Sequence, residues 1–255
     1  MILDGHTHIH PRADGWGAEH DASVETLVGM LGDGGVQRAV VLPIAPEVSN
    51  EFIAEACGRH PTRLIGFASV EPLGPFAVRD FEYAIQELGL KGLKLHPRRQ
   101  RFGRADFEKL LPLIAKAADL GRPVLMDGFP YGREQFDTRE VELVNALATA
   151  LPHARIILAH AGGCDVLRAL LVAKANPNVF VDLSFTLQYY EGSSVENDLA
   201  FLVRRLRGER TIFGSDHPYV TVARAYDEAA KFLDRCGMNE SQLAAIFGGT
   251  MASLL

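Results

Sequence analysis

Eight short apolar runs, separated by stretches with a helical pattern, constrain the fold of this chain more than any other feature. The runs are rich in β-branched residues and lie at residues 1–3, 38–43, 64–70, 92–95, 123–126, 155–158, 179–183 and 211–213. In intervals such as 107–120 and 139–151, apolar residues return every three or four positions, which is typical of a helix with one buried face. The sequence therefore predicts eight strands that alternate with helices.

The size of the repeat favours one architecture among those that alternate strands and helices. Eight units in 255 residues have about 32 residues each, the size of a βαβ repeat. Near-continuous apolar strands are typical of a parallel sheet that is covered on both faces. A doubly wound open sheet usually opens with a glycine-rich phosphate loop, which this sequence lacks. We therefore predict a (β/α)8 TIM barrel, a single domain over residues 1–255, with an extra C-terminal helix at 240–247.

Composition and charge exclude several classes of function. The formal net charge is −6, and no extended basic face is present to bind nucleic acid. No apolar run approaches the roughly 18 residues that cross a bilayer, and the N-terminus has no signal-peptide pattern. Cys57, Cys164 and Cys236 form no paired motif and are predicted to be reduced thiols. We expect a cytoplasmic protein that acts on a small molecule, binds neither nucleic acid nor membranes, and is either a monomer or a homo-oligomer.

Polar residues at the ends of the first and last predicted strands form the strongest functional signal. Catalytic residues of such barrels lie at the carboxyl ends of the strands. His6 and His8 are two positions apart, so both side chains point the same way and suit one metal ion. Asp216 follows the eighth strand, which pairs with the first in a closed barrel. We predict that Asp216 binds the same ion and accepts a proton from the water on it.

Histidines and a lysine occupy the ends of the fourth and sixth predicted strands. His160 precedes Gly162 and Gly163, which allow the backbone to approach a ligand and to offer free N–H groups to an anion. We predict a catalytic role for His160 beside this oxyanion site. In the fourth strand, Lys94 and His96 share one face, and each is a candidate metal ligand or substrate contact. A lysine inside a barrel must be paired, carbamylated or neutral.

Arginines and aromatic residues are predicted to recognise the substrate. Arg98, Arg99 and Arg101 follow the fourth strand, and a guanidinium matches the geometry of a carboxylate or phosphate. Arg12 and Arg133, on neighbouring loops, are expected to join them. Aromatic residues after the fifth and seventh strands are predicted to form a wall for an unsaturated or ring-shaped substrate. They are Phe129, Tyr131, Tyr189 and Tyr190.

Five motifs lie in register with the first, fourth, sixth and eighth strands and with the C-terminus. They are DGHTH at 4–8, GLKLHP at 92–97, AHAGG at 159–163, GSDHP at 214–218 and IFGGT at 246–250. Together they resemble the amidohydrolase superfamily, in particular the branch of metal-dependent hydrolases related to aminocarboxymuconate-semialdehyde decarboxylase. The resemblance implies a divalent ion, usually zinc, bound by His6, His8 and Asp216. It also implies that His160 polarises the substrate or assists proton transfer.

The fifth strand departs from this resemblance. Members of the branch commonly have a ligand histidine there, whereas this sequence has Asp127. Three alternatives follow: Asp127 binds the metal directly, His96 supplies the missing nitrogen and Asp127 orients it, or the metal site is weakened or lost. A carboxylate in place of an imidazole favours oxygen-tolerant ions. The expected cofactor is one divalent ion, Zn²⁺ by the resemblance, with Mn²⁺ as the alternative.

Three functions are consistent with these residues. The one we predict is a metal-dependent hydrolase of a small, anionic, carboxylate-bearing ester, lactone or amide. In it a metal-activated water attacks, Asp216 accepts the proton and His160 stabilises the oxyanion. The second, implied by the resemblance, is a non-oxidative decarboxylase of an unsaturated or aromatic carboxylic acid on the same metal. The third is a non-catalytic barrel that binds a metabolite after losing its metal. The reason for this alternative is Asp127, which stands in place of a ligand histidine.

Overall fold

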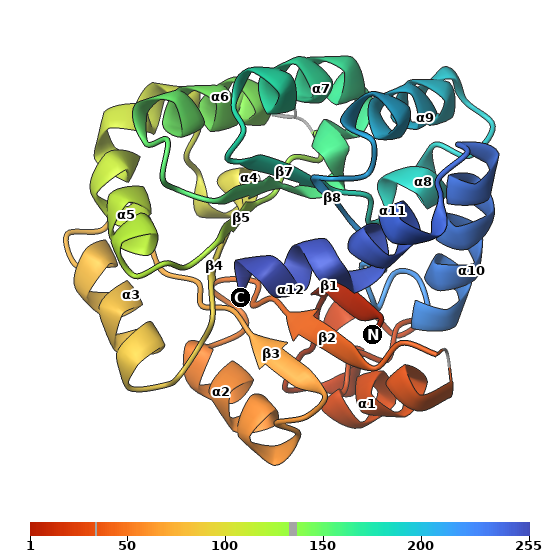
Figure 1. Cartoon of the computed structure of the whole chain (residues 1–255). Coiled ribbons are helices and arrows are strands. Elements are labelled where there is room, and N and C mark those ends of the chain that lie inside the picture. Colours follow the sequence, from red (N-terminus) through yellow and green to blue (C-terminus); the bar gives the residue numbers. More distant parts are fainter. Residues whose placement is uncertain (34, 133–136) are drawn as a thin grey trace.

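The computed structural model describes residues 1–33, 35–132 and 137–255, and it has parallel strands inside a ring of helices (Figure 1). The strands are β1 (Leu3–Thr7), β2 (Arg38–Val41), β3 (Leu64–Gly66), β4 (Leu93–Leu95), β5 (Val124–Met126), β6 (Ile156–Leu158), β7 (Val179–Asp182) and β8 (Thr211–Ile212). Hydrogen bonds join β1, β2 and β3 into one sheet and the strands from β4 through β8 into another. Each strand pairs with the next one in the chain, and every pair is parallel. Parallel bridges from Thr7 to His217 and from Ala68 to Leu93 close the two seams. The predicted TIM barrel is confirmed.

Helices follow the strands and cover the outside of the barrel. The α-helices are α1 (Val24–Asp33), α2 (Asn50–Arg59), α3 (Ala77–Gln86), α4 (Pro97–Gln100), α5 (Phe107–Asp119), α6 (Glu140–Ala150), α7 (Val166–Ala175), α8 (Thr186–Tyr189), α9 (Ser194–Leu206), α10 (Val222–Arg235), α11 (Glu240–Ala244) and α12 (Thr250–Leu254). Short 3₁₀ segments are η1 (Ala13–Trp16), η2 (Arg104–Asp106) and η3 (Ala159–Asp165), and η4 (Ala245–Gly249) is a π turn. No helix in the described ranges is both long and apolar enough to cross a membrane.

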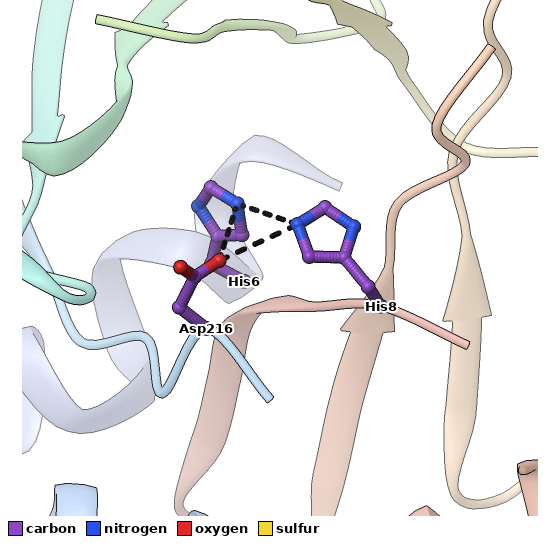
Figure 2. Close-up of side chains that lie close together, drawn as sticks. All are labelled: His6, His8 and Asp216. Atoms are coloured by element: carbon purple, nitrogen blue, oxygen red, sulfur yellow. Dashed lines mark hydrogen bonds and ion pairs between the residues drawn. The ribbon is translucent and has the colours of Figure 1, made fainter. Parts of the chain in front are cut away.

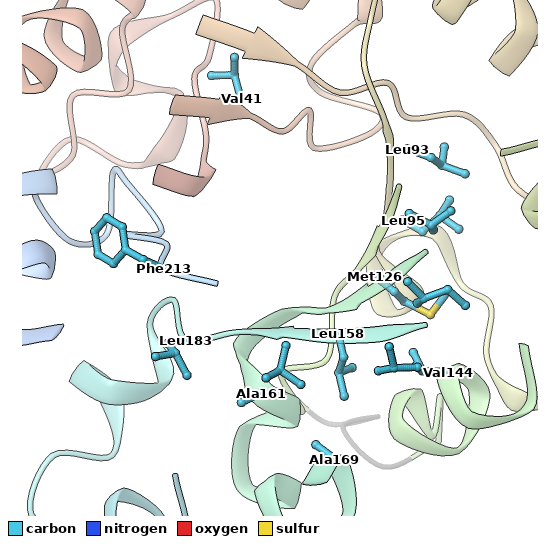
Figure 3. Packing of buried hydrophobic residues seen from close by; sticks show 14 of the residues in the cluster. Val41, Leu93, Leu95, Met126, Val144, Leu158, Ala161, Ala169, Leu183 and Phe213 are labelled. Atoms are coloured by element: carbon cyan, nitrogen blue, oxygen red, sulfur yellow. The ribbon is translucent and has the colours of Figure 1, made fainter. Parts of the chain in front are cut away.

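The core has two layers because successive side chains of a strand point to opposite faces. In β5, Val124 and Met126 pack outward against the helices, whereas Leu125 points into the barrel. In β6, Leu158 packs outward and Ile157 points inward. Figure 3 shows part of the outer layer, where strand residues meet helix residues such as Val144 and Ala169. This alternation leaves the ends of the strands free to carry polar groups.

The first strand differs from its predicted range. It spans Leu3–Thr7 rather than residues 1–3, whereas the other strands begin within one residue of the predicted positions. The apolar signal ends at Leu3 because Asp4 and His6 are polar, yet both are fully buried. Both side chains have hydrogen-bond partners inside the barrel: Asp4 Oδ1 accepts from the Ser215 amide at 3.0 Å, and His6 contacts Asp182. Paired polar side chains thus extend the strand beyond its apolar part.

The C-terminal segment is more helical than predicted. The helix expected at 240–247 is divided into α11 and the π turn η4, and the chain continues as α12 to Leu254. In Figure 1, α12 lies across the end of the barrel, next to β1. Met251 and Leu254 from α12 join the inward-facing residues of the strands, and both are buried. Burial of these two side chains explains why the tail is ordered.

Shortening of the Leu254 side chain in α12 is expected to destabilise the fold. Leu254→Ala should lower the free energy of unfolding by about 2–5 kcal/mol, because it leaves a cavity at the closed end of the barrel. Leu171→Ala, at a leucine of α7 that is 69% exposed, is the matched control and should change it by less than about 0.5 kcal/mol. Chemical denaturation measures both. If the loss for Leu254→Ala were as small as the one expected for the control, Leu254 would contribute little to the core.

Candidate metal centre

The seam between β8 and β1 brings together side chains from opposite ends of the chain. The amide of His8 donates to the His217 carbonyl at 2.8 Å, and the amide of Asp216 donates to the His6 carbonyl at 2.8 Å. Asp216 has a left-handed backbone with φ of 60°, a conformation that aspartate adopts more readily than most residues. Barrel closure therefore places Asp216 beside both histidines.

Three ligand atoms converge at this seam, as Figure 2 shows. His6 Nε2 and His8 Nε2 are 3.2 Å apart, and Asp216 Oδ1 is 3.4 Å from each of them. All three residues are buried, with at most 5% of any one exposed. The structure thus brings together the three residues that the sequence singled out at the first and last strands.

Hydrogen bonds to the far nitrogens define the protonation of both imidazoles. His8 Nδ1 donates to the carbonyl of Leu42 at 2.8 Å, and His6 Nδ1 donates to Asp182 Oδ2 at 2.9 Å. Burial lowers the pKa of His6 to about 4, although the charge of Asp182 opposes this shift. On the neutral His6 ring, the proton on Nδ1 leaves a lone pair on Nε2, and the bond from His8 Nδ1 to Leu42 turns His8 Nε2 toward the same point. Two imidazole nitrogens and a carboxylate oxygen then face one another.

The residues present fit a divalent cation. Three lone-pair atoms at these distances repel one another unless a cation lies among them. Ligands at about 2.0–2.1 Å from a tetrahedral ion are about 3.3–3.4 Å apart, close to the separations of these three atoms. The donor set of two imidazole nitrogens and one carboxylate oxygen, His6, His8 and Asp216, suits zinc and also accepts manganese.

Asp182, at the end of β7, belongs to this site, and the sequence analysis missed it. It is fully buried, and besides His6 it accepts hydrogen bonds from the amides of Ser184 at 2.9 Å and His160 at 3.2 Å. A carboxylate on the far nitrogen fixes the tautomer and orientation of a ligand histidine. The signal was a lone aspartate that ends an otherwise apolar strand at 179–182.

His160, which follows β6, is held between two acceptors. Its Nδ1 lies 2.9 Å from the Ser184 carbonyl, and its Nε2 lies 3.3 Å from Asp127 Oδ2. Burial would lower the pKa of His160, but the hydrogen bond to Asp127 and the charge of Asp216 raise it to about 9. The contact with Asp127 therefore favours the imidazolium form of His160, which is suited to stabilise negative charge or to donate a proton.

Asp127 and His96 lie beside the three converging ligands. Asp127 Oδ2 is 3.7 Å from His96 Nε2, so this carboxylate lies between His96 and His160. Burial lowers the pKa of His96 to about 3. Within the described ranges, neither Asp127 nor His96 belongs to a group of mutually close ligand atoms, whereas His160 forms a second such group with His6 and Asp182.

Gly162 and Gly163 allow the chain to pack closely against itself. His160 has φ of 57°, and the left-handed conformation continues to Gly163 at 60°. A Cβ on Gly163 would lie 2.6 Å from Pro130 Cδ, and one on Gly162 would lie 3.2 Å from Val141 Cγ2. The close approach that these glycines permit is therefore to the chain's own loops, and the left-handed turn directs His160 toward the centre.

A cavity of about 470 Å³ opens beside the centre. Polar residues on its lining include Asp216, His160, Asp127 and Lys94. Burial lowers the pKa of Lys94, and the charges of Asp127 and Asp216 oppose this shift. Aromatic side chains line the rest of the wall, and all but Tyr131 contact another member of the group. They are Trp16, Phe129, Tyr131, Phe185, Tyr189 and Tyr219.

The predicted substrate contacts divide into two groups. Arg98, Arg99 and Tyr131 line the cavity, and the Arg98 guanidinium lies 5.8 Å from the centre of the Tyr131 ring. Arg101 is exposed and does not line it, because it ends α4 in a left-handed conformation with φ of 54°. Arg12 lies 3.7 Å from Asp14 and also does not line it. The predicted contact Arg133 lies outside the described residues.

Comparison with known families shows to which family the chain belongs. The sequence model of the amidohydrolase family matches residues 4–255. The chain belongs to the amidohydrolase family. This confirms the resemblance inferred from the five motifs. No curated protein matches the sequence.

Solved amidohydrolase-like structures share the fold at low sequence identity. A zinc-bound amidohydrolase from Burkholderia multivorans has a TM-score of 0.74 and 18% identity, with 100% of this chain and 98% of that one covered. A probable 2-pyrone-4,6-dicarboxylic acid hydrolase from Acinetobacter baumannii, with citric acid bound, has a TM-score of 0.74 and 15% identity, covering 99% and 98%. A manganese-bound dihydroxybenzoic acid decarboxylase from Polaromonas sp. JS666 has 0.73 and 16%, covering 99% and 96%. Structures that share this fold thus include a probable hydrolase and a decarboxylase.

Proposed function

We propose that this amidohydrolase is a metal-dependent hydrolase of a small, carboxylate-bearing ester, lactone or amide. The observation that carries the proposal is the convergence of three ligand atoms, from His6, His8 and Asp216, beside a cavity of about 470 Å³. A cavity of this size suits a small molecule. The free thiols of Cys57 and Cys164 fit a reducing compartment, so the proposal includes a cytoplasmic location.

The residues of the cavity divide the chemistry of hydrolysis among them. A divalent cation at the three ligand atoms would lower the pKa of water and polarise a carbonyl group. Asp216 accepts the proton of the attacking water, because its carboxylate borders both the ligand atoms and the cavity. The cationic imidazole of His160 stabilises the oxyanion that develops on the carbonyl. Asp127 keeps His160 protonated, and Arg98 contacts the acidic group of the substrate.

A non-oxidative decarboxylase is the second candidate, and the state of His160 favours it. Loss of CO₂ leaves a carbanion that must be protonated, and an imidazolium held by Asp127 is a ready proton donor. The decarboxylase among the similar structures supports this candidate. Hydrolysis and decarboxylation differ in their products, so one screen separates them. Acid release from lactones, esters and amides supports the hydrolase, and CO₂ release from aromatic or unsaturated carboxylic acids supports the decarboxylase.

Metal binding is expected to change the fluorescence of the only tryptophan. The Trp16 ring stacks on His8, with centroids 5.0 Å apart and planes at 22°, so Mn²⁺ on His8 should quench its emission. Titration of chelator-treated protein should saturate near one ion per chain, with Zn²⁺ competing. The matched control for this titration is His10→Ala. His10 accepts a hydrogen bond from the amide of Arg12 and is not one of the three ligands, so its replacement should leave the titration unchanged. His8→Ala should abolish it. Quenching that persists in His8→Ala would place the ion elsewhere, and no binding would favour a non-catalytic barrel.

A further inference from the structure

Lys94 is a buried lysine that the proposed chemistry leaves unused. It lies in β4, between two outward-facing leucines, so its side chain points to the inside of the barrel. Only 1% of the residue is exposed, and it lines the same cavity as Asp216 and His160. Lys94 is therefore on the deep part of the cavity wall, next to the reacting groups.

The ammonium group of Lys94 has no protein partner in the described ranges. No carboxylate oxygen there lies within 4.0 Å of Nζ, and no hydrogen bond from Nζ to those residues forms. An ammonium removed from water is costly unless an anion or several acceptors replace its hydration. The carboxylates of Asp127 and Asp216 act on Lys94 only from beyond 4.0 Å, and within these ranges no acceptor bonds Nζ, so the cavity leaves room for an anionic ligand to contact it.

A second cation on the same wall is also unpaired. Arg98 lies in α4, three residues beyond the end of β4, and is half-buried. Its Nε is buried without a hydrogen-bond partner among the described residues. Arg99, by contrast, is exposed and forms an ion pair with Glu47 at 3.2 Å. The wall thus has two basic side chains, Lys94 and Arg98, for which the described residues supply no ion-pair partner, in a protein whose net charge is −6.

We propose that Lys94 binds the carboxylate of the substrate at the buried end of the cavity, and that Arg98 supports it from above. The inference rests on the proposed function in that it assigns the acidic group of the same substrate. Because Lys94 lines the same cavity as Asp216 and His160, this assignment puts the carboxylate on the same side of the substrate as the carbonyl that is attacked. The substrate class is therefore an ester, lactone or amide with its carboxylate near the reacting carbon, and the exposed arginines of the rim are not its main contact.

Binding of a simple aromatic anion tests this assignment without turnover. Isothermal titration calorimetry would compare benzoate with the neutral benzamide on metal-loaded wild type and Lys94→Met. Benzoate should bind Lys94→Met about 10- to 100-fold more weakly, because a hydrogen bond to a charged group is lost. Benzamide affinity should stay within about twofold. The matched control is Lys91→Met, at an exposed lysine of the same segment that does not line this cavity, and it should change neither affinity.

Stability and mass measurements separate a ligand-binding lysine from a structural or modified one. Without benzoate, Lys94→Met should unfold at the same or a higher temperature than wild type, because an apolar side chain replaces an unpaired buried charge. A marked fall in unfolding temperature would overturn the proposal, as would equal weakening of benzoate and benzamide or unchanged benzoate affinity. A native mass higher by one CO₂ on Lys94 would also overturn it. If benzoate selectivity depends on Lys94 but no ester, lactone or amide is cleaved, this site stands and the hydrolase proposal fails.

Discussion

Replacement of Asp216 by asparagine is expected to remove most of the bound metal and to lower turnover on the order of a thousandfold. The side chain supplies the only carboxylate in the group formed with His6 and His8, and its Oδ1 lies 3.4 Å from both imidazoles. Asparagine keeps the shape but presents a neutral, weaker ligand that cannot accept a proton. Mass spectrometry of the metal and the initial rate on a substrate found by screening measure the two losses separately.

The control for this variant is Asp14→Asn. Asp14 is an exposed aspartate on the loop after β1, and it lies 3.7 Å from Arg12. This change should leave both metal content and rate as in wild type. Should Asp216→Asn retain one tightly bound ion per chain, the convergence in Figure 2 is not the metal centre, and the chemistry derived from it fails.

The fold was predictable from the sequence where burial and polarity agree. Apolar strands such as β5 and β6 begin within one residue of their predicted positions, because outward and inward faces are both buried and the whole strand is apolar. The prediction was incomplete where polar residues are buried as pairs, as in β1. It was also incomplete in α12, whose burial depends on the far end of the barrel, a contact that no local pattern contains.

The site was predictable to the extent that barrel closure makes distant residues neighbours. Closure places Asp216 beside His6 and His8, and the motifs that resemble the family mark the same residues. The role of Asp182 depends on a single 2.9 Å contact, and one aspartate at a strand end is equally typical of a cap or turn. Arg101 does not line the cavity, because its own backbone is left-handed, and no feature of the local sequence predicts that conformation.

Replacement of Asp127 by asparagine is expected to shift the pH dependence of the reaction. Asp127 contributes to a His160 pKa of about 9, so wild type keeps the imidazolium through neutral pH. In the variant this pKa should fall toward the ordinary value of about 6.5, and the protonated form is then lost at lower pH. The alkaline limb of kcat/KM should move down by about two pH units. Activity at pH 8 should fall about ten- to thirtyfold, while activity near pH 6 should change little.

The same variant tests direct ligation by Asp127, one of the alternatives that the sequence left open, against the contact with His160 that the structure shows. If Asp127 positions and charges His160, as its 3.3 Å contact indicates, Asp127→Asn keeps its metal and only the alkaline limb moves. If Asp127 is itself a ligand, the metal content falls and the rate drops at every pH, with the limb in place. Asp119→Asn, at an exposed aspartate that ends α5, should reproduce wild type in both measurements. A limb that stays at wild-type pH with full metal would contradict both roles and leave His160 protonated by other neighbours.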